Sequence, residues 1–384
     1  MESIWRYTPD LVAMTAGAFL SWLAGAWLSG RVAPALRRWV RAGALISATW
    51  IALSFLFALP AVYRHWPLTG WLAWLKGFGI MWTLALTGAV AVQAAMAAAR
   101  RIAPPFEPGR RAVIETVGAL ASAAPVAALG WGTYIERRDF RLAEVELRVP
   151  MLHRDLHGLR IVQITDTHMG DFFTRRDMEY AVGMANETKA HLALMTGDLI
   201  SVRGDPLDEC LRQLARVKAE AGLVGCLGNH EIASDCEDYV EREGRKLGLR
   251  FLRTEQEVIR FGSATMNIAG VDYQRRGKPY LRGAEACLRP GMLNVLLSHN
   301  PDVFPEAAKM GYHLTFSGHT HGGQVTVEIL HQYLNVARFF TPYVYGVYER
   351  EGKSIYVSRG LGTVGAPVRC GAPPEVALIK LCAT

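Results

Sequence analysis

The sequence has few cysteines, and none of them is arranged as a metal or redox pair. All six lie after residue 200, and no two are separated by two residues, so neither a zinc ribbon nor a thioredoxin-like motif is present. We interpret them as buried free thiols. Because their number is even, disulfides stay an open alternative if the domain is exported.

The sequence also lacks a basic stripe with interleaved aromatic residues, the pattern typical of nucleic-acid-binding domains. Its pI of about 9.1 has another source. Residues 1–141 carry a formal net charge of +8, whereas residues 142–384 carry −1. The basic charge belongs to the N-terminal part, and we expect no nucleic-acid partner.

Long apolar runs dominate the first 141 residues. Four of them approach the ~20 apolar residues that a helix needs to cross a bilayer. These predicted spans are residues 11–30, 42–63, 77–99 and 116–135. A single run would also suit a buried core helix, but four in series disfavour that alternative. Residues 1–141 are therefore predicted to form a transmembrane region. A cleaved signal peptide is disfavoured because the first run is too long for one.

The arginines between the predicted spans indicate the orientation, because such residues concentrate in cytoplasmic loops. The segments after the first and third spans are rich in arginine, and the segment after the second has only Arg64. The arginines of the two rich segments are Arg31, Arg37, Arg38, Arg41, Arg100, Arg101, Arg110 and Arg111. They predict an integral membrane protein whose second domain is extracytoplasmic. Arg137, Arg138 and Arg141 follow the fourth predicted span and favour the opposite orientation. The predicted orientation also inverts if the fourth run does not cross the membrane.

The remaining residues alternate between short β-type runs and helical stretches. Strands predicted at 159–165, 192–196 and 222–227 precede helices predicted at 175–189, 205–218 and 234–247. Later strands, with fewer helices between them, are predicted at 257–261, 265–271, 293–298, 313–317, 354–358 and 376–381. This order predicts an α/β domain over residues 147–384, with two packed sheets and helices outside.

Polar residues able to bind metal follow five of these strands directly. They are Asp166 and His168, Asp198, Asn229 and His230, His299, and finally His319 and His321. Side chains at the carboxyl ends of neighbouring strands meet at one edge of a sheet. The mixture of carboxylate, amide and imidazole suits Mn, Fe or Zn, whereas Mg or Ca would prefer oxygen alone. Without His230, seven such ligands remain, which are too many for one tetrahedral site but suit two metal ions that activate water and clamp a phosphoryl group.

The motifs in this order are DTH, GD, GNHE, a single histidine and GHTHGGQ. With their strand context, they make residues from about 150 to 384 resemble the calcineurin-like metallophosphoesterase superfamily. The resemblance implies a four-layer α/β/β/α sandwich and two divalent metal ions. The SGHTHGGQ extension and the tail SRGLGT are similar to a membrane-anchored bacterial phosphodiesterase branch, which has members similar to UDP-diacylglucosamine diphosphatases. This resemblance implies a location in a bacterial inner membrane.

The resemblance also implies a role for each residue. One metal would take Asp166, His168 and His321, and the other would take Asn229, His299 and His319. Asp198 would bridge the two ions. His230 would bind no metal; it would contact the phosphate beside Asn229 and protonate the leaving oxygen as general acid.

Some positions depart from the family pattern. Many relatives have a second aspartate in the GDxxD motif that orients the catalytic histidine, and here that position is Ser201. Arg203 is a possible phosphate contact, although a solvated surface arginine is the simpler interpretation. His313 is interpreted as structural, Glu231 as support for the site, and Arg359 is left open.

The predicted function is hydrolysis of a phosphomonoester, phosphodiester or pyrophosphate bond, with an envelope lipid or nucleotide-sugar phosphate as the substrate that a membrane anchor suggests. The alternative is a non-catalytic membrane sensor or scaffold that keeps its metals for folding. The presence of His230 argues against that alternative, because metal binding alone does not need it. A transporter or channel is disfavoured because only Lys76 and Glu115 bring charge to the spans, both near span ends.

Overall fold

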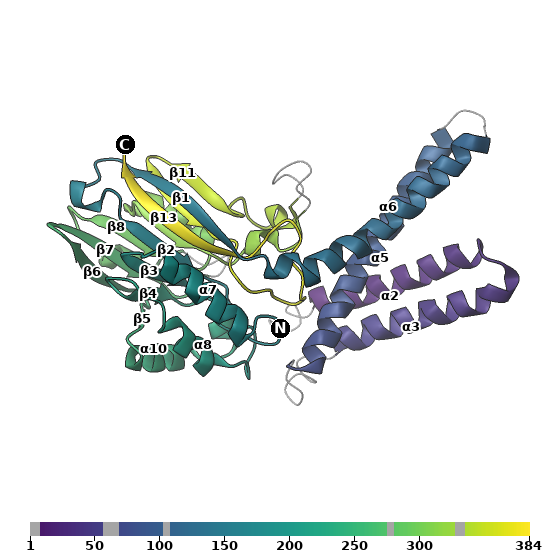
Figure 1. Ribbon diagram of the computed structural model, residues 1–384, viewed down its shortest axis with the longest axis horizontal. Coiled ribbons are helices and arrows are strands. Elements are labelled where there is room, and N and C mark those ends of the chain that lie inside the picture. Colours follow the sequence, from purple (N-terminus) through teal and green to yellow (C-terminus); the bar gives the residue numbers. More distant parts are fainter. Residues whose placement is uncertain (1–7, 57–68, 103–107, 275–279, 327–334) are drawn as a thin grey trace. The chain divides into compact units, whose positions relative to one another are not determined.

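The structure is a computed structural model that describes residues 8–56, 69–102, 108–274, 280–326 and 335–384 (Figure 1). It divides into two compact units. The first contains Met1–Tyr134 and Gly365–Val368, and the second contains Ile135–Val364 and Arg369–Thr384.

The first unit is helical, and its four long helices overlap the four predicted spans. They are α2 (Thr8–Ser29), α3 (Arg37–Leu56), α5 (Trp71–Ile102) and α6 (Pro108–Tyr134). The last part of the second predicted span, residues 57–63, lies outside the described residues. Among the described helices, Pro34–Leu56 and Trp71–Ala98 are long and apolar enough to cross a membrane. Length and composition do not separate a span from a core helix, so the four-span topology stays a prediction.

Small residues allow these helices to pack closely. A Cβ atom added at Gly25 of α2 would lie 2.4 Å from the Ala44 Cβ of α3, and one at Gly79 of α5 would lie 2.3 Å from the Ser54 Oγ. Close approach at glycine is typical of helices that associate inside membranes.

The second unit contains two six-stranded sheets. The first has the order β1-β13-β2-β3-β4-β5, and β2 to β5 are parallel. Its strands are β1 (Arg141–Val149), β2 (Arg160–Ile164), β3 (Leu192–Thr196), β4 (Leu223–Cys226), β5 (Arg250–Phe251) and β13 (Glu375–Ala383). The second has the order β11-β12-β9-β8-β7-β6, with β7, β8, β9 and β12 parallel. Its strands are β6 (Glu255–Phe261), β7 (Ala264–Gly270), β8 (Leu293–Leu297), β9 (Leu314–Ser317), β11 (Gly346–Arg350) and β12 (Lys353–Val357).

Three apolar layers hold the two sheets and their helices together, which confirms the predicted α/β/β/α class. The central core lies between the sheets and includes Ile161 of β2 and Phe316 of β9. On the other face of the first sheet lie α7 (Arg175–Glu187), α8 (Leu207–Leu214) and α10 (Glu237–Lys246) (Figure 1). The short helix α11 (Phe304–Met310) covers the second sheet through Phe304 and Ala308.

The structure starts the α/β unit earlier than residue 147. Arg141–Val149 pairs in parallel with β13 along its whole length. Its alternating polar and apolar residues suit an edge strand with one buried face. The partner strand begins at Glu375, so this pairing is not visible in any local pattern.

Candidate metal centre

The polar residues predicted at strand ends do meet at one place. Asp166 and His168 follow β2, Asp198 follows β3, and Asn229 and His230 follow β4. His299 follows β8, and His319 and His321 follow β9. Because these strands are parallel within each sheet, their carboxyl ends lie on the same edge, and both sheets contribute to one site.

One group of potential ligands joins Asp166, His168 and His321. The two Nε2 atoms of His168 and His321 lie 3.1 Å apart. His321 Nε2 lies 3.5 Å from Asp166 Oδ1. All three residues are buried, with their ligand atoms within 4.8 Å of one another.

A second group joins Asp198, His299 and His319. Asp198 Oδ2 lies 3.0 Å from His299 Nε2, and His319 Nδ1 lies 3.2 Å from the same nitrogen. Asp198 Oδ2 also lies 3.5 Å from His168 Nε2 of the first group. Asp198 is therefore the carboxylate that both groups share.

Backbone strain coincides with this site. Five of its residues have left-handed backbone: Asp166 (φ 50°), His168 (φ 44°), Asp198 (φ 58°), His319 (φ 74°) and His321 (φ 52°). For a residue with a Cβ atom, each such conformation costs about 1–2 kcal/mol. Strain of this kind persists only where the surroundings enforce it, and it gathers at functional sites.

Two glycines leave the room that the carboxylates occupy. A Cβ atom at Gly228 would lie 2.1 Å from Asp198 Oδ1, and one at Gly318 would lie 2.0 Å from Asp166 Oδ2. Real Cβ atoms do not approach oxygen so closely, so glycine is required by close packing at both positions.

Comparison with known families agrees with this geometry. Residues 159–323, which include every residue of the two groups, match the model of the family described as calcineurin-like phosphoesterase. The chain contains a calcineurin-like phosphoesterase domain. The family assignment predicted from the strand-end motifs is thereby confirmed.

Proteins similar to this chain occur in bacteria and animals. An uncharacterized metallophosphoesterase of Bacillus subtilis, YkuE, is 28% identical over 273 residues, which cover 70% of this chain and 95% of the relative. A transmembrane protein with metallophosphoesterase domain from Danio rerio is 27% identical, covering 63% of this chain and 57% of its own length. Among solved structures, the phosphopantetheinyl hydrolase PptH of Mycobacterium tuberculosis is 13% identical with a TM-score of 0.35, covering 53% of this chain and 91% of its own.

The side chains fit a pair of metal ions. Asn229 Oδ1 is buried and has no hydrogen-bond partner among the described residues, which suits a metal ligand and is costly otherwise. His299 Nδ1 lies 2.7 Å from the Thr196 carbonyl, and donating to it leaves Nε2, on the side of Asp198, as the nitrogen available to a metal. Two pairs of imidazole nitrogens face each other at hydrogen-bond distance. A cation between such nitrogens satisfies both lone pairs.

Burial and neighbouring carboxylates shift the pKa values of the histidines and of Asp166 in the metal-free site. Burial lowers the pKa of His319 to about 3, and it also lowers the pKa values of His168 and His321. Burial acts on His299 in the same direction, but the carboxylates of Asp198 and Asp166 outweigh it and raise the pKa of His299 to about 10. Burial raises the pKa of Asp166 to about 6.

Metal binding should consequently release protons. His299 is protonated below about pH 10 in the metal-free protein, and a metal at its Nε2 must displace that proton. We expect the apparent metal affinity to rise about tenfold per pH unit from pH 7 to 9, and more steeply below about pH 6, where Asp166 is also protonated. Calorimetric titration in buffers of different ionisation enthalpy measures the proton count. Metal binding without proton release at pH 8 would contradict this assignment.

Ser201 stands where many relatives have the aspartate that orients the catalytic histidine, and it contacts two histidines of the site. Its backbone carbonyl lies 2.5 Å from His230 Nδ1, so the ring is oriented by a carbonyl and not by a carboxylate. Its hydroxyl lies 3.1 Å from His168 Nδ1. Asp205 holds this turn by accepting from the backbone N–H groups of Ser201 and Val202 at 2.9 Å each. One residue thus positions both His168 and His230.

Replacing Ser201 with alanine should separate the positioning of His168 from the positioning of His230. The carbonyl that holds His230 remains, whereas His168 loses its side-chain partner. We expect about a 10–100-fold loss of metal affinity, with kcat restored at saturating metal. The Ser201→Thr variant, which keeps a hydroxyl, should recover most of the affinity. A low kcat at saturating metal with unchanged affinity would show that the hydroxyl acts on His230 instead.

Glu231 supports the site without facing it. Its fully buried carboxylate accepts from the backbone N–H groups of Gly228 (2.7 Å), Leu199 (2.8 Å) and Asp198 (2.9 Å). Burial, together with the charge of Asp198, raises its pKa, and the three donors oppose that shift. Glu231 therefore ties the turn after β3 to the turn after β4, as the sequence suggested.

Two residues near the site were not found from the sequence. Tyr273 Oη lies 3.4 Å from His319 Nε2, the nitrogen that faces away from Asp198 and His299. Arg369 is fully buried, donates to the carbonyls of Gly362 and Ala372 at 2.9 Å, and lies 3.4 Å from His321 Nδ1. Neither belongs to a recognisable motif, so only the fold reveals them.

The remaining singled-out residues lie at the periphery. Arg203 is exposed on the turn after β3, and its assignment as a phosphate contact stays a prediction. His313 Nδ1 accepts from the Asn294 N–H at 3.0 Å, which suits a structural residue. Arg359 pairs with Glu375 at 3.0 Å and stacks over the Tyr345 ring at 4.0 Å.

Proposed function

We propose that this domain hydrolyses a phosphoester or pyrophosphate bond with two divalent metal ions. The observation that carries the proposal is the shared position of Asp198, whose Oδ2 lies 3.0 Å from His299 Nε2 and 3.5 Å from His168 Nε2. Asp166, His168 and His321 would hold one ion, and Asn229, His299 and His319 the other. Two bound ions supply positive charge to the phosphoryl oxygens and acidify the attacking water.

His230 supplies the proton in this proposal. Its Nδ1 faces the Ser201 carbonyl, so Nε2 points toward the site, 4.0 Å from Asp198 Oδ2. As an imidazolium, the ring donates through Nδ1 to the carbonyl and through Nε2 to the leaving oxygen. The backbone N–H of His230 donates to Asp198 Oδ1 at 2.9 Å, which keeps the two residues in a set geometry.

The proposed substrate is amphiphilic, such as a lipid-linked envelope phosphoester. Phe339 and Phe340 expose 86% and 67% of their surface in the same unit as the site. They lie at the end of the helical turn Val336–Phe339, whose capping residue Asn335 donates to the Gly322 carbonyl at 2.7 Å. Gly322 directly follows His321, so an exposed aromatic pair is attached to a metal-ligand turn. Exposed apolar groups of this kind suit contact with lipid.

The purified full-length protein tests the proposed reaction with bis-p-nitrophenyl phosphate. We expect turnover that depends on added Mn, Zn or Fe and is lost with a chelator. Metal binding without turnover on this diester, on phosphomonoesters and on pyrophosphates would favour the non-catalytic scaffold instead. Substituting both Phe339 and Phe340 with serine should raise KM for a long-chain substrate and leave the bis-p-nitrophenyl phosphate reaction unchanged.

We also propose that the catalytic unit lies outside the cytoplasm, on the basis of the arginine-rich segments after the first and third predicted spans. A pair of C-terminal reporter fusions tests this orientation. A periplasmic alkaline phosphatase fusion should be active, and a fluorescent protein that matures only in the cytoplasm should be dark. The reverse result would place the domain inside.

A further inference from the structure

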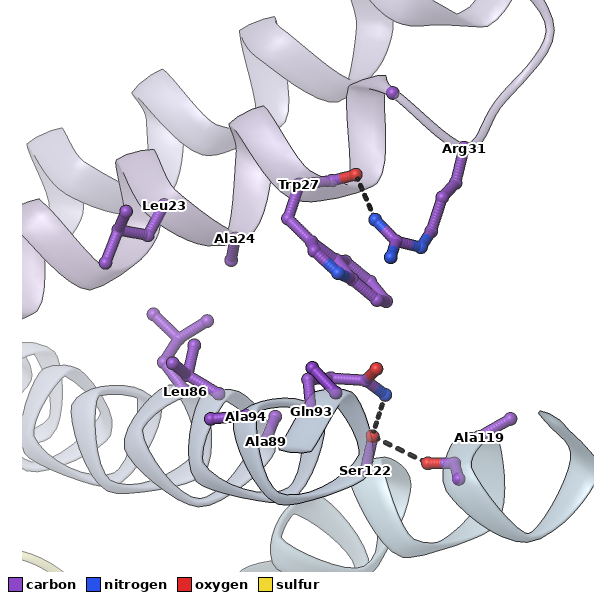
Figure 2. Close-up of a pocket in the computed structure, with 14 residues that line it drawn as sticks. Leu23, Ala24, Trp27, Arg31, Leu86, Ala89, Gln93, Ala94, Ala119 and Ser122 are labelled. Atoms are coloured by element: carbon purple, nitrogen blue, oxygen red, sulfur yellow. Dashed lines mark hydrogen bonds between the residues drawn. The ribbon is translucent and has the colours of Figure 1, made fainter. Parts of the chain in front are cut away.

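The helical unit contains a cavity that has no part in the metal centre. It has a volume of about 1040 Å³ and is lined by residues from α2, α5 and α6. Figure 2 shows Leu23, Ala24 and Trp27 on one side, facing Leu86 and Ala89 on the other. Its size matches the upper end of ligand sites, which run to about 1,000 Å³.

The cavity has one cationic end. Arg31 lines it, and its guanidinium carbon lies 4.0 Å from the centroid of the Trp27 ring. Arg31 Nη1 donates to the Trp27 carbonyl at 3.2 Å (Figure 2). Arg31 is exposed, and its guanidinium carries five N–H donors; among the described residues, the Trp27 carbonyl is its one hydrogen-bond acceptor. An anionic group placed there would meet several remaining donors.

Most of the other lining residues are apolar, and the main polar pair is already hydrogen-bonded. Gln93 Nε2 donates to Ser122 Oγ at 2.6 Å, and Ser122 Oγ donates to the Gly118 carbonyl at 2.7 Å (Figure 2). Small residues such as Ala89, Ala94 and Ala119 form much of the wall. The walls therefore suit a hydrocarbon chain, whereas the Arg31 end suits negative charge.

We propose that this cavity binds an anionic phospholipid, with an acyl chain between α2, α5 and α6 and the phosphate-containing headgroup at Arg31. Charge complementarity selects this occupant. Residues 11–106 contain no aspartate or glutamate, so no acidic side chain of that stretch competes for Arg31. Arg31 also belongs to the first arginine-rich segment, which is predicted to face the cytoplasmic leaflet, where anionic lipids attract basic residues.

The full-length protein, stripped of lipid in detergent, tests the site by native mass spectrometry. It is offered phosphatidylglycerol or phosphatidylcholine with the same acyl chains, and the retained lipid is counted. We expect phosphatidylglycerol to be retained at least about fivefold better. The Arg31→Gln variant should lose this preference. The Ala89→Trp variant, which fills the cavity, should lose retention of both lipids.

Two matched variants control for general effects. Arg38 lies in the same segment and stacks over Trp39 at 5.2 Å, but it does not line the cavity, so Arg38→Gln should keep the preference. Ala91→Trp adds the same bulk to α5 outside the lining and should keep both lipids. An unchanged helical circular-dichroism signal and unchanged elution in size-exclusion chromatography in all four variants report intact folding of the helical unit. Equal losses in the two arginine variants, no headgroup preference in the native chain, or full retention in Ala89→Trp would each overturn the proposal.

Discussion

Replacing His230 with alanine should lower kcat by about 10²–10⁴-fold and leave two metal ions bound per chain. The imidazole is expected to donate a proton to the leaving oxygen, and it is not needed as a ligand. Its backbone N–H, which donates to Asp198 Oδ1, is unaffected by the substitution. Metal content measured by mass spectrometry and steady-state turnover of the same preparation check both halves of the prediction.

The choice of leaving group sharpens this experiment. An oxygen that leaves readily as an anion needs little help from an acid, whereas an alkoxide needs a proton in the transition state. The loss in His230→Ala should therefore be larger for an alkyl phosphodiester than for bis-p-nitrophenyl phosphate. His153→Ala, which changes an exposed histidine of the same unit, is the control. Equal losses for both substrates would leave charge stabilisation, and not proton transfer, as the role of His230.

Replacing Asp198 with asparagine should remove most of the metal from both positions. Asp198 lies within ligand distance of both groups. Its carboxylate is 2% exposed, so solvent screens the attraction between its negative charge and a bound cation only weakly. Loss of partners that only support a ligand costs about 10–100-fold in affinity, and loss of a shared ligand should exceed that at each ion. Turnover should fall to the background rate. Metal titration followed by mass spectrometry measures the remaining equivalents.

An aspartate elsewhere in the unit provides the comparison. Asp208 is hydrogen-bonded to the Tyr239 hydroxyl at the surface, and Asp208→Asn should keep two metal ions and full turnover. Thermal unfolding of the metal-free proteins separates a folding defect from a binding defect. If Asp198→Asn kept one ion with native affinity, the carboxylate would belong to a single metal, and the shared-ligand assignment would be wrong.

Much of the site was predictable from short stretches of sequence. Asp166, Asp198, Asn229, His299 and His319 each follow an apolar run that reads as a buried strand. The carboxyl ends of parallel strands meet at an edge, so residues far apart in the chain could be placed together. The glycines in GNHE and GHTHGGQ were also informative, because they stand where a Cβ atom would strike Asp198 or Asp166.

Other features could not be predicted because they depend on contacts between distant segments. The identity of residue 201 as serine does not predict that its carbonyl contacts His230 and that its hydroxyl contacts His168. The guanidinium of Arg369 lies 3.4 Å from His321 Nδ1, although the two residues are far apart in the chain. The strand Arg141–Val149 is stabilised by Glu375–Ala383, at the other end of the domain.

The sequence by itself determined the chemical types available for a site, their order along the chain and the strand ends that bring them together. These follow from local patterns of burial and from the few residue types that bind metal. Only the tertiary structure decided which atoms face one another: the shared oxygen of Asp198, the two roles of Ser201 and the cavity ending at Arg31. Those relations depend on distances between segments that are far apart in the chain, and local sequence does not encode such distances.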